Sequence, residues 1–300
     1  MPELNGSTLR KPILMDYIRL LVASAIWGSS FLAIELALAD FPPVAIASYR
    51  IIFAALLLLV ICGWKGLGTT LDATKLTLFV AIGLLNSVVP FSLIGWGQLR
   101  IDSATTAILL TSSPFVTLLL SHFMTQDDRF AWNKLAGLVM GFGGVLVLLG
   151  QGINQGGGSF SGMLAVIVAA ACYSLSSILI RRLGAMSSLV LVTGSLLAAA
   201  LVMIPILLLF YPPWQQSYQS YSLAALAYLA LGPTAIAYVL RAQIVQFNGA
   251  VFMSNVGYLI PLFAVLWGWL LLDQIPSTSM WVALAMVLTG IALGQRRKHT

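Results

Sequence analysis

Two charged side chains, Glu35 and Arg50, stand inside long apolar segments of this chain. A charge in hydrocarbon needs a partner, and a guanidinium can bind a carboxylate through two parallel hydrogen bonds, which lysine cannot do. Arg50 lies about 10 Å inside its segment at a rise of about 1.5 Å per residue, and Glu35, near the external end of the first segment, is the nearest candidate partner in depth. We predict that the two form a structural or gating ion pair. The alternative is that Arg50 binds the carboxylate of a ligand.

Four prolines inside apolar segments are predicted to kink helices, because proline removes a backbone donor and leaves a carbonyl without its partner. Pro114 and Pro261 stand at matching depths of two segments, 147 positions apart (261 minus 114), nearly half of the 300 residues. Pro90 and Pro233 stand near glycines in two further segments. Kinked helices at corresponding places of two repeats are typical of the central binding site of a secondary transporter.

Polar and aromatic side chains accompany these prolines. Toward lipid they would lose free energy without compensation, so we expect them to face the interior of the protein. The predicted cavity residues are Trp27, Asn86, Trp96, Thr111, Tyr173, Tyr238, Asn255 and Tyr258. Hydrogen bonding and packing between helices is the other interpretation of each residue taken alone.

The elements that must position these residues are membrane-spanning helices. With 60% hydrophobic and 8% charged residues, the chain is too apolar for a water-soluble protein, where about a quarter of residues are charged. Strands of alternating polarity, expected of a membrane barrel, are absent from the sequence. Segments of about 20 residues can cross a bilayer as helices. Ten are predicted, at residues 18–38, 44–62, 76–96, 104–123, 132–150, 162–180, 188–211, 222–240, 250–272 and 277–294.

Basic residues set the predicted orientation, because Lys and Arg are retained on the cytoplasmic side. Apart from Arg50 within a span, all of them except Arg100 fall on one set of helix ends, which places both termini in the cytoplasm. The predicted organisation is an all-α protein with a cytoplasmic segment (1–17), a five-helix repeat (18–150), a linker (151–161), a second five-helix repeat (162–294) and a basic tail (295–300). Repeats with an odd number of spans enter the membrane in opposite senses.

The sequence resembles the EamA-type branch of the drug/metabolite transporter superfamily over essentially its whole length. The residues that carry the resemblance are Trp27-Gly28-Ser29-Ser30-Phe31, Pro42-Pro43, Ala47-Ser48-Tyr49-Arg50, Ser103-Ala104 through Pro114 to Asp127, Gly137 and Gly144. In the second half, Cys172-Tyr173-Ser174-Leu175 stands at the Trp-Gly position and no arginine matches Arg50. The resemblance implies two inverted five-helix repeats, no cofactor, and export of small organic solutes across the inner membrane of a bacterium. Bacterial amino-acid exporters of YddG type look closest, which implies aromatic or neutral amino acids as substrates.

The sequence argues against other classes. Intramembrane enzymes need paired aspartates, HExxH or a reachable nucleophile and histidine, and the only histidines are His122 and the tail residue His299. No metal site is predicted, and the net charge of +6 is a topology signal rather than a nucleic-acid footprint. A non-catalytic membrane scaffold and an exporter of other metabolites or drugs with proton coupling remain alternatives.

The sequence leaves the energy coupling of transport and the oligomeric state open. No Asp, Glu or His stands near the middle of a predicted span, so facilitated diffusion is the simplest mechanism, with Glu35 as a possible proton carrier at the outer mouth. A cavity without fixed midplane charge should accept neutral, zwitterionic or aromatic solutes. Pairs of glycines at 137/141 and 290/294 fit either a monomer with these helices in contact or a homodimer.

Overall fold

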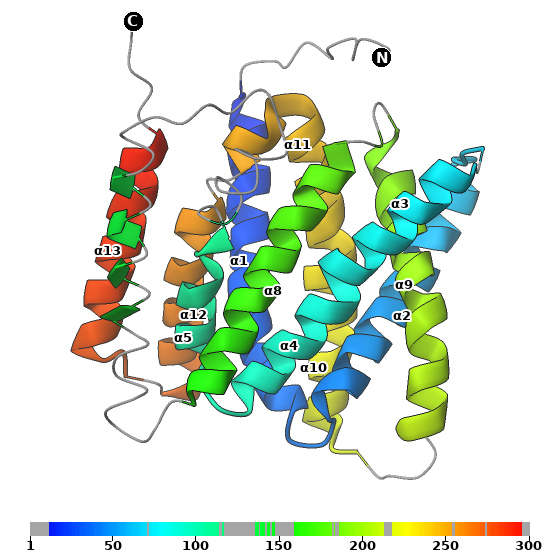
Figure 1. Ribbon diagram of the computed structural model, residues 1–300. Helices are drawn as coiled ribbons and strands as arrows, with labels where there is room; N and C mark the ends of the chain where they lie inside the picture. The colour runs from blue at the N-terminus through cyan, green and yellow to red at the C-terminus, as the bar shows by residue number, and fades with distance from the viewer. Residues whose placement is uncertain are drawn as a thin grey trace, which may run out of the picture.

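The computed structural model describes residues 12–70, 72–113, 116, 136–137, 139–141, 143–144, 146–147, 159–181, 183, 186–212, 218–253, 256–273 and 275–295. These form a bundle of helices that run roughly side by side (Figure 1). The first half contains α1 (Leu14–Ala37), α2 (Pro43–Trp64), α3 (Ala73–Gly83), α4 (Val89–Gln98) and α5 (Ser103–Leu110). The second contains α8 (Phe160–Arg181), α9 (Ser188–Phe210), α10 (Ser220–Leu229), α11 (Ala237–Met253), α12 (Val256–Leu272) and α13 (Thr278–Gln295).

Helices from the two halves interleave in the bundle. The most extensive contacts join α1 with α12, α2 with α9, and α4 with α8, so neither half forms a separate body. The beginning of α1 and the end of α13 lie at the same end of the bundle (Figure 1). Pairs made from opposite halves therefore build the interior.

Six continuous helical stretches among the described residues are long and apolar enough to cross a membrane by length and composition. The stretch Ala73–Gln98, which contains α3 and α4, counts as one, and so does Ser220–Ile244, which contains α10 and the beginning of α11. The six stretches correspond to the predicted segments 18–38, 44–62, 76–96, 162–180, 188–211 and 222–240. Two shorter apolar helices, Leu259–Leu271 and Thr278–Gly290, lie within the predicted segments 250–272 and 277–294. The segment 104–123 is described at its beginning, while 132–150 and Asp127 lie mostly or wholly outside the described residues. The multi-pass helical class is confirmed, and the full set of ten spans stays a prediction.

One predicted helix end differs from the structure. The eighth predicted segment stops at Leu240, whereas α11 continues to Met253, and α12 begins at Val256. Polar residues Arg241, Gln243 and Gln246 follow the apolar run in the sequence and so resemble a helix end. They nevertheless remain in the helix because the bundle supplies polar partners, at least for Arg241.

Two short π-helical segments interrupt long helices, one in each half. η1 (Leu84–Val88) joins α3 to α4, and η2 (Ala230–Ile236) joins α10 to α11. At their ends the Val89 and Ala237 amides bond to carbonyls five residues earlier, Leu84 and Gly232. The starts of η1 and η2 are 146 positions apart (230 minus 84), close to the proline offset found in the sequence. Each segment lies at a proline, Pro90 after η1 and Pro233 within η2, as expected of π-bulges at functional positions.

Glycines allow close approach where the halves meet. A Cβ on Gly28 of α1 would lie 2.5 Å from Cβ of Phe263 and 3.0 Å from the Ala264 nitrogen of α12. A Cβ on Gly83 at the end of α3 would clash with the Ser195 carbonyl oxygen of α9. These contacts explain why helices from opposite halves pack with their backbones near each other.

We expect Gly28→Ala to destabilise the protein by about 1–3 kcal/mol, the usual range for overpacking. Gly63→Ala is the matched control, because nothing lies within 4 Å of a Cβ at that position. Its effect should be neutral or slightly stabilising, since alanine favours a helix over glycine. Thermal unfolding of both variants in detergent checks this. Equal melting temperatures would contradict the close α1–α12 packing.

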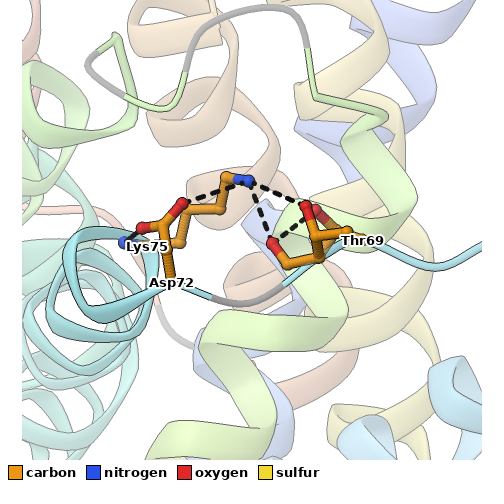
Figure 2. Close-up of polar contacts among 4 residues, drawn as sticks. Thr69, Asp72 and Lys75 are labelled. Atoms are coloured by element: carbon orange, nitrogen blue, oxygen red, sulfur yellow. Dashed lines mark hydrogen bonds and ion pairs between the residues drawn. The ribbon is translucent and has the colours of Figure 1, made fainter.

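The start of α3 is fixed by a polar loop (Figure 2). The Lys75 backbone N–H donates to Asp72 Oδ1 at 2.8 Å, and Lys75 Nζ lies 3.3 Å from Asp72 Oδ2. Lys75 Nζ also donates to the Thr70 carbonyl at 2.9 Å. The backbone hydrogen bond lowers the pKa of Asp72 below its ordinary value, so the carboxylate stays ionised and caps the helix at neutral pH. This cap fixes where the helix that leads to η1 begins.

Candidate functional site

A cluster of polar and aromatic side chains lies where the two kinked helices meet α1, α2 and α8. We call it the central polar cluster. Its members are Trp27, Arg50, Asn86, Phe91, Tyr173, Ser176, Ser177, Thr234, Tyr238 and Arg241. Both π segments contribute to it, and the first-half and second-half residues contact one another directly.

The first kink supplies a backbone acceptor to the cluster. Pro90 has no N–H to donate to the carbonyl of Asn86, four residues earlier, so this carbonyl loses its helical partner. The Tyr238 hydroxyl of α11 donates to it at 2.8 Å. A buried carbonyl that proline leaves unpaired is therefore satisfied by a side chain from the opposite half.

The second kink works in the same way. Pro233 leaves the Leu229 carbonyl without its helical donor, and the Thr234 hydroxyl donates to that oxygen at 2.7 Å. Oγ1 of Thr234 in turn accepts a hydrogen bond from Arg50 Nε at 3.0 Å. Trp27 Nε1 donates to the carbonyl of Pro233 at 3.0 Å. The distorted backbone of η2 thus holds α1 and α2 through side-chain hydrogen bonds.

Arg50 lies deep in the cluster and is only 5% exposed. Its Cζ stands 3.6 Å from the centroid of the Phe91 ring, a cation–π contact that strengthens where water is excluded. Phe91 also packs against Tyr238, with ring centroids 6.2 Å apart, and Tyr238 packs edge-on against Trp27 at 6.3 Å. Three aromatic rings, one each from α4, α11 and α1, therefore pack in a row that begins at the guanidinium.

Arg241 enters the cluster from α11. Its Nη1 donates to Asn86 Oδ1 at 2.9 Å and its Nη2 donates to Ser177 Oγ at 2.8 Å. Tyr173 of α8 packs against the buried cluster that contains Tyr238 and Phe91. Two guanidiniums therefore share one environment with two phenols.

Sequence reasoning missed Arg241 because it stands one residue beyond the predicted segment 222–240. The signal that was present is its position eight residues after Pro233, about 12 Å further along a helix. A kinked helix that continued past Leu240 would bring this arginine within reach of the polar residues around Pro90. The structure thus adds Arg241 to Arg50 as a second arginine among the predicted cavity residues, and a cavity without fixed charge at the midplane stays a prediction.

The structure brings four of the predicted cavity residues, Trp27, Asn86, Tyr173 and Tyr238, into one cluster. Trp96 is placed elsewhere, 36% exposed near the end of α4, where its ring stacks on Arg100 at 3.6 Å.

The five remaining predicted residues lie around the kinks expected at Pro114 and Pro261. Thr111 is buried at the end of α5, where its hydroxyl donates to the Ile108 carbonyl. Pro261 is inside α12, which also contains the backbone of Tyr258. The side chain of Tyr258, together with Pro114 and Asn255, lies outside the described residues.

The contacts of Arg50 differ from the predicted pair with Glu35. Its partners among the described residues are Thr234 and Phe91, and the described ion pairs, Arg19–Asp16 and Lys75–Asp72, do not include it. The reason is the π segment, which turns the Thr234 hydroxyl toward α2. The sequence alone does not show which hydroxyl a π-helical segment directs toward a neighbouring helix.

We expect Thr234→Val to lower stability by about 1–3 kcal/mol, because it leaves the Leu229 carbonyl and Arg50 Nε without partners in a buried site. Thr289→Val is the matched control, since the Thr289 hydroxyl bonds only within its own exposed helix face. Chemical or thermal unfolding of the two variants in detergent makes the comparison. Equal stabilities would contradict the Arg50–Thr234 link.

Comparison with known proteins agrees with a transporter. The profile of the EamA-like transporter family matches residues 14–150 and 160–294. The chain is similar to the uncharacterized transporter YoaV of Bacillus subtilis, 22% identical over 89% of this chain and 91% of that protein. It is 26% identical to an S-adenosylmethionine/S-adenosylhomocysteine transporter of Chlamydia trachomatis, over 89% and 85%. A protein solved by crystallography shares the fold, with a TM-score of 0.69, 21% identity, and coverage of 94% and 96%.

Proposed function

We propose a specific activity for this chain, which belongs to the EamA-like transporter family: it exports small organic solutes, first of all aromatic or neutral amino acids, across a bacterial inner membrane. Its relatives are membrane transporters, a class distinct from enzymes. In the proposal, ten helices form two inverted repeats, 18–150 and 162–294, and both termini are cytoplasmic.

One observation carries the proposal. Each half contributes a proline-associated π segment, and the residues around the two segments hydrogen bond across the halves, Tyr238 to Asn86 and Arg50 to Thr234. Binding sites of secondary transporters lie between repeats at interrupted helices. In an alternating-access cycle the halves rock about this cluster and the interrupted helices bend. Pro114 and Pro261 would add flexibility in the fourth and ninth helices.

The composition of the cluster supports an amino-acid-like solute. Trp27, Tyr173 and Tyr238 supply aromatic walls, and a guanidinium such as that of Arg50 suits a carboxylate. The Chlamydia relative is named for S-adenosylmethionine, which is itself an amino acid that bears an aromatic ring. Trp96, Thr111, Asn255 and Tyr258 would belong to the entrance or to another state of the cavity.

Facilitated diffusion is the proposed mode of transport. The runner-up is export of other metabolites or drugs coupled to protons, with Glu35 as the carrier at the outer mouth. A non-catalytic scaffold is the further alternative. We propose a monomer as the functional unit, with a homodimer as the other assembly; Gly290 packs on Gly137 and Gly141 within the chain.

The test is flux of labelled amino acids, aromatic and aliphatic, in proteoliposomes with and without an imposed pH gradient. Flux that is saturable and independent of the gradient is expected. Accumulation driven by the gradient would replace diffusion by proton coupling and make Glu35→Gln the next variant. If purified, folded protein moves no amino acid, the amino-acid assignment is wrong. If it also moves no other organic solute, the scaffold alternative holds.

A further inference from the structure

We infer that the central polar cluster recognises its solute through an oxyanion, a carboxylate or phosphate, and that it transports solutes of net negative charge faster than zwitterions. The oxyanion would bind between Arg50 and Arg241, beside the phenols of Tyr173 and Tyr238. This inference rests on the proposed export of organic solutes, and within that class it ranks organic anions above the zwitterionic amino acids.

The first step is the charge balance of the cluster. Arg50 and Arg241 hydrogen bond to neutral acceptors, the Thr234 hydroxyl, the Asn86 amide oxygen and the Ser177 hydroxyl. Within the part of the chain that the structure describes, neither arginine takes part in an ion pair. Arg50 is buried and Arg241 is partly exposed, and a buried cation without a counter-charge is strongly disfavoured in a membrane protein and marks a binding or transport pathway. A ligand anion would supply the missing charge.

The second step is the geometry of Arg50. Thr234 takes the Nε–H, and the Phe91 ring covers one face of the guanidinium. No acceptor for its terminal nitrogens is found among the residues described here, although the side chain is only 5% exposed. The two terminal nitrogens form the fork that binds carboxylate or phosphate through parallel hydrogen bonds. The stacking and the Nε bond hold this fork in a fixed orientation.

The third step is the donor set around the fork. The Tyr238 hydroxyl donates a hydrogen bond to the Asn86 carbonyl, and Tyr173 packs against the buried cluster that contains Tyr238. Arg241 is anchored by the same Asn86 from the other side. An anion that entered would therefore meet two cations that are already oriented. A cationic ammonium group would meet the same two charges, so a zwitterion gains less than an anion.

Net negative charge also bears on the driving force. Over a complete transport cycle the charge moved equals the charge of the solute, whatever charges the protein holds. An inside-negative membrane potential then drives an anion outward, about tenfold in concentration ratio for about 60 mV per charge. Export would need no proton-binding carboxylate at the middle of a span.

The experiment uses solutes that share one ring and differ in charge. N-acetyltyrosine is an anion, tyrosine a zwitterion and tyrosine amide a cation, and phenyl phosphate offers phosphate in place of carboxylate. Uptake of each is measured in proteoliposomes of wholly neutral lipid, at fixed inside-positive, zero and inside-negative potentials. The inference predicts at least about tenfold faster uptake of one or both anions than of the amide, and accumulation that follows the potential with the sign of an anion.

Two substitutions test whether the anion binds at the central polar cluster. Asn86→Asp is nearly isosteric and places a carboxylate at the oxygen that now accepts from Arg241 at 2.9 Å. It should fold at least as stably as the native chain and lose anion uptake at least about tenfold, because the site then holds its own counter-ion. Arg50→Met should also lose uptake without loss of thermal stability, since it removes a buried charge. A residue that served structure alone would lower the melting temperature when replaced.

Arg100→Met is the control. Arg100 stacks on Trp96 at the same 3.6 Å as Arg50 on Phe91, but it lies at a helix end outside the cluster, so its loss should leave anion uptake unchanged. If tyrosine or its amide is transported as well as the anions, or if Asn86→Asp transports anions normally, the oxyanion inference is wrong and the transport function stands. If the native protein transports no solute at all, the proposed function itself is wrong.

Discussion

The double variant Pro90→Ala, Pro233→Ala is expected to transport at least about tenfold more slowly while it still folds, because the gain in helix propensity offsets the polar contacts that are lost. Alanine restores the missing amide donors and favours a regular helix by about 3 kcal/mol per site. The Asn86 and Leu229 carbonyls would then bond within their own helices and no longer need Tyr238 and Thr234. Losing one π segment also rotates the following helix by about 100°, which would move Tyr238 and Arg241 away from Asn86.

Pro205→Ala is the control for this pair. Pro205 is also inside a helix, α9, but on an exposed face away from the central polar cluster. Initial rates of solute uptake and melting temperatures should be measured for both proteins. A double variant with native flux, or one that loses flux no more than Pro205→Ala, would remove the π segments from the mechanism.

Asn86→Ala should have the largest effect on stability of any single substitution in the cluster, a loss of about 2–3 kcal/mol. Asn86 Oδ1 accepts from Arg241 at 2.9 Å and from Ser176 at 3.2 Å, and a hydrogen bond to a charged group contributes about 1.5–3 kcal/mol. Alanine leaves Arg241 Nη1 without an acceptor inside the bundle.

Ser176→Ala tests the Ser176–Asn86 hydrogen bond separately from the Arg241–Asn86 hydrogen bond. The Ser176 hydroxyl also donates to the Tyr173 carbonyl of its own helix, so its loss leaves the Arg241–Asn86 bond in place and should cost less than about 1 kcal/mol. Unfolding in detergent, followed by circular dichroism or tryptophan fluorescence, makes the comparison. Similar losses for the two variants would show that Arg241 does not depend on Asn86.

The class of protein follows from the sequence because hydrophobic length is a local property. Six spans appear where runs of about 20 apolar residues predict them, and the Trp-Gly and Pro-Pro motifs indicate the family that the comparison shows. Prolines predict kinks for an equally local reason, the missing amide donor, and the described helices are interrupted at Pro90 and Pro233.

The site could be predicted only in part, since it depends on contacts between distant helices. Trp27, Asn86, Tyr173 and Tyr238 were found because polar groups inside spans must face inward. Depth in the sequence pairs Arg50 with Glu35. In the structure the π-helical turn of η2 directs the Thr234 hydroxyl toward Arg50 instead. Arg241 was excluded by the drop in hydropathy after Leu240, although partners on η1 and α8 keep it inside the helix.

Counterflow tests the central claim, alternating access through the cluster between the halves, most directly. Proteoliposomes loaded with excess unlabelled solute are diluted into trace labelled solute, with the membrane potential clamped at zero. The account predicts a transient overshoot of label inside the vesicles, because a site open to one side at a time exchanges solute for solute. The overshoot should disappear in the Pro90→Ala, Pro233→Ala variant and persist in Pro205→Ala. Label that enters without an overshoot would indicate a channel and contradict the account.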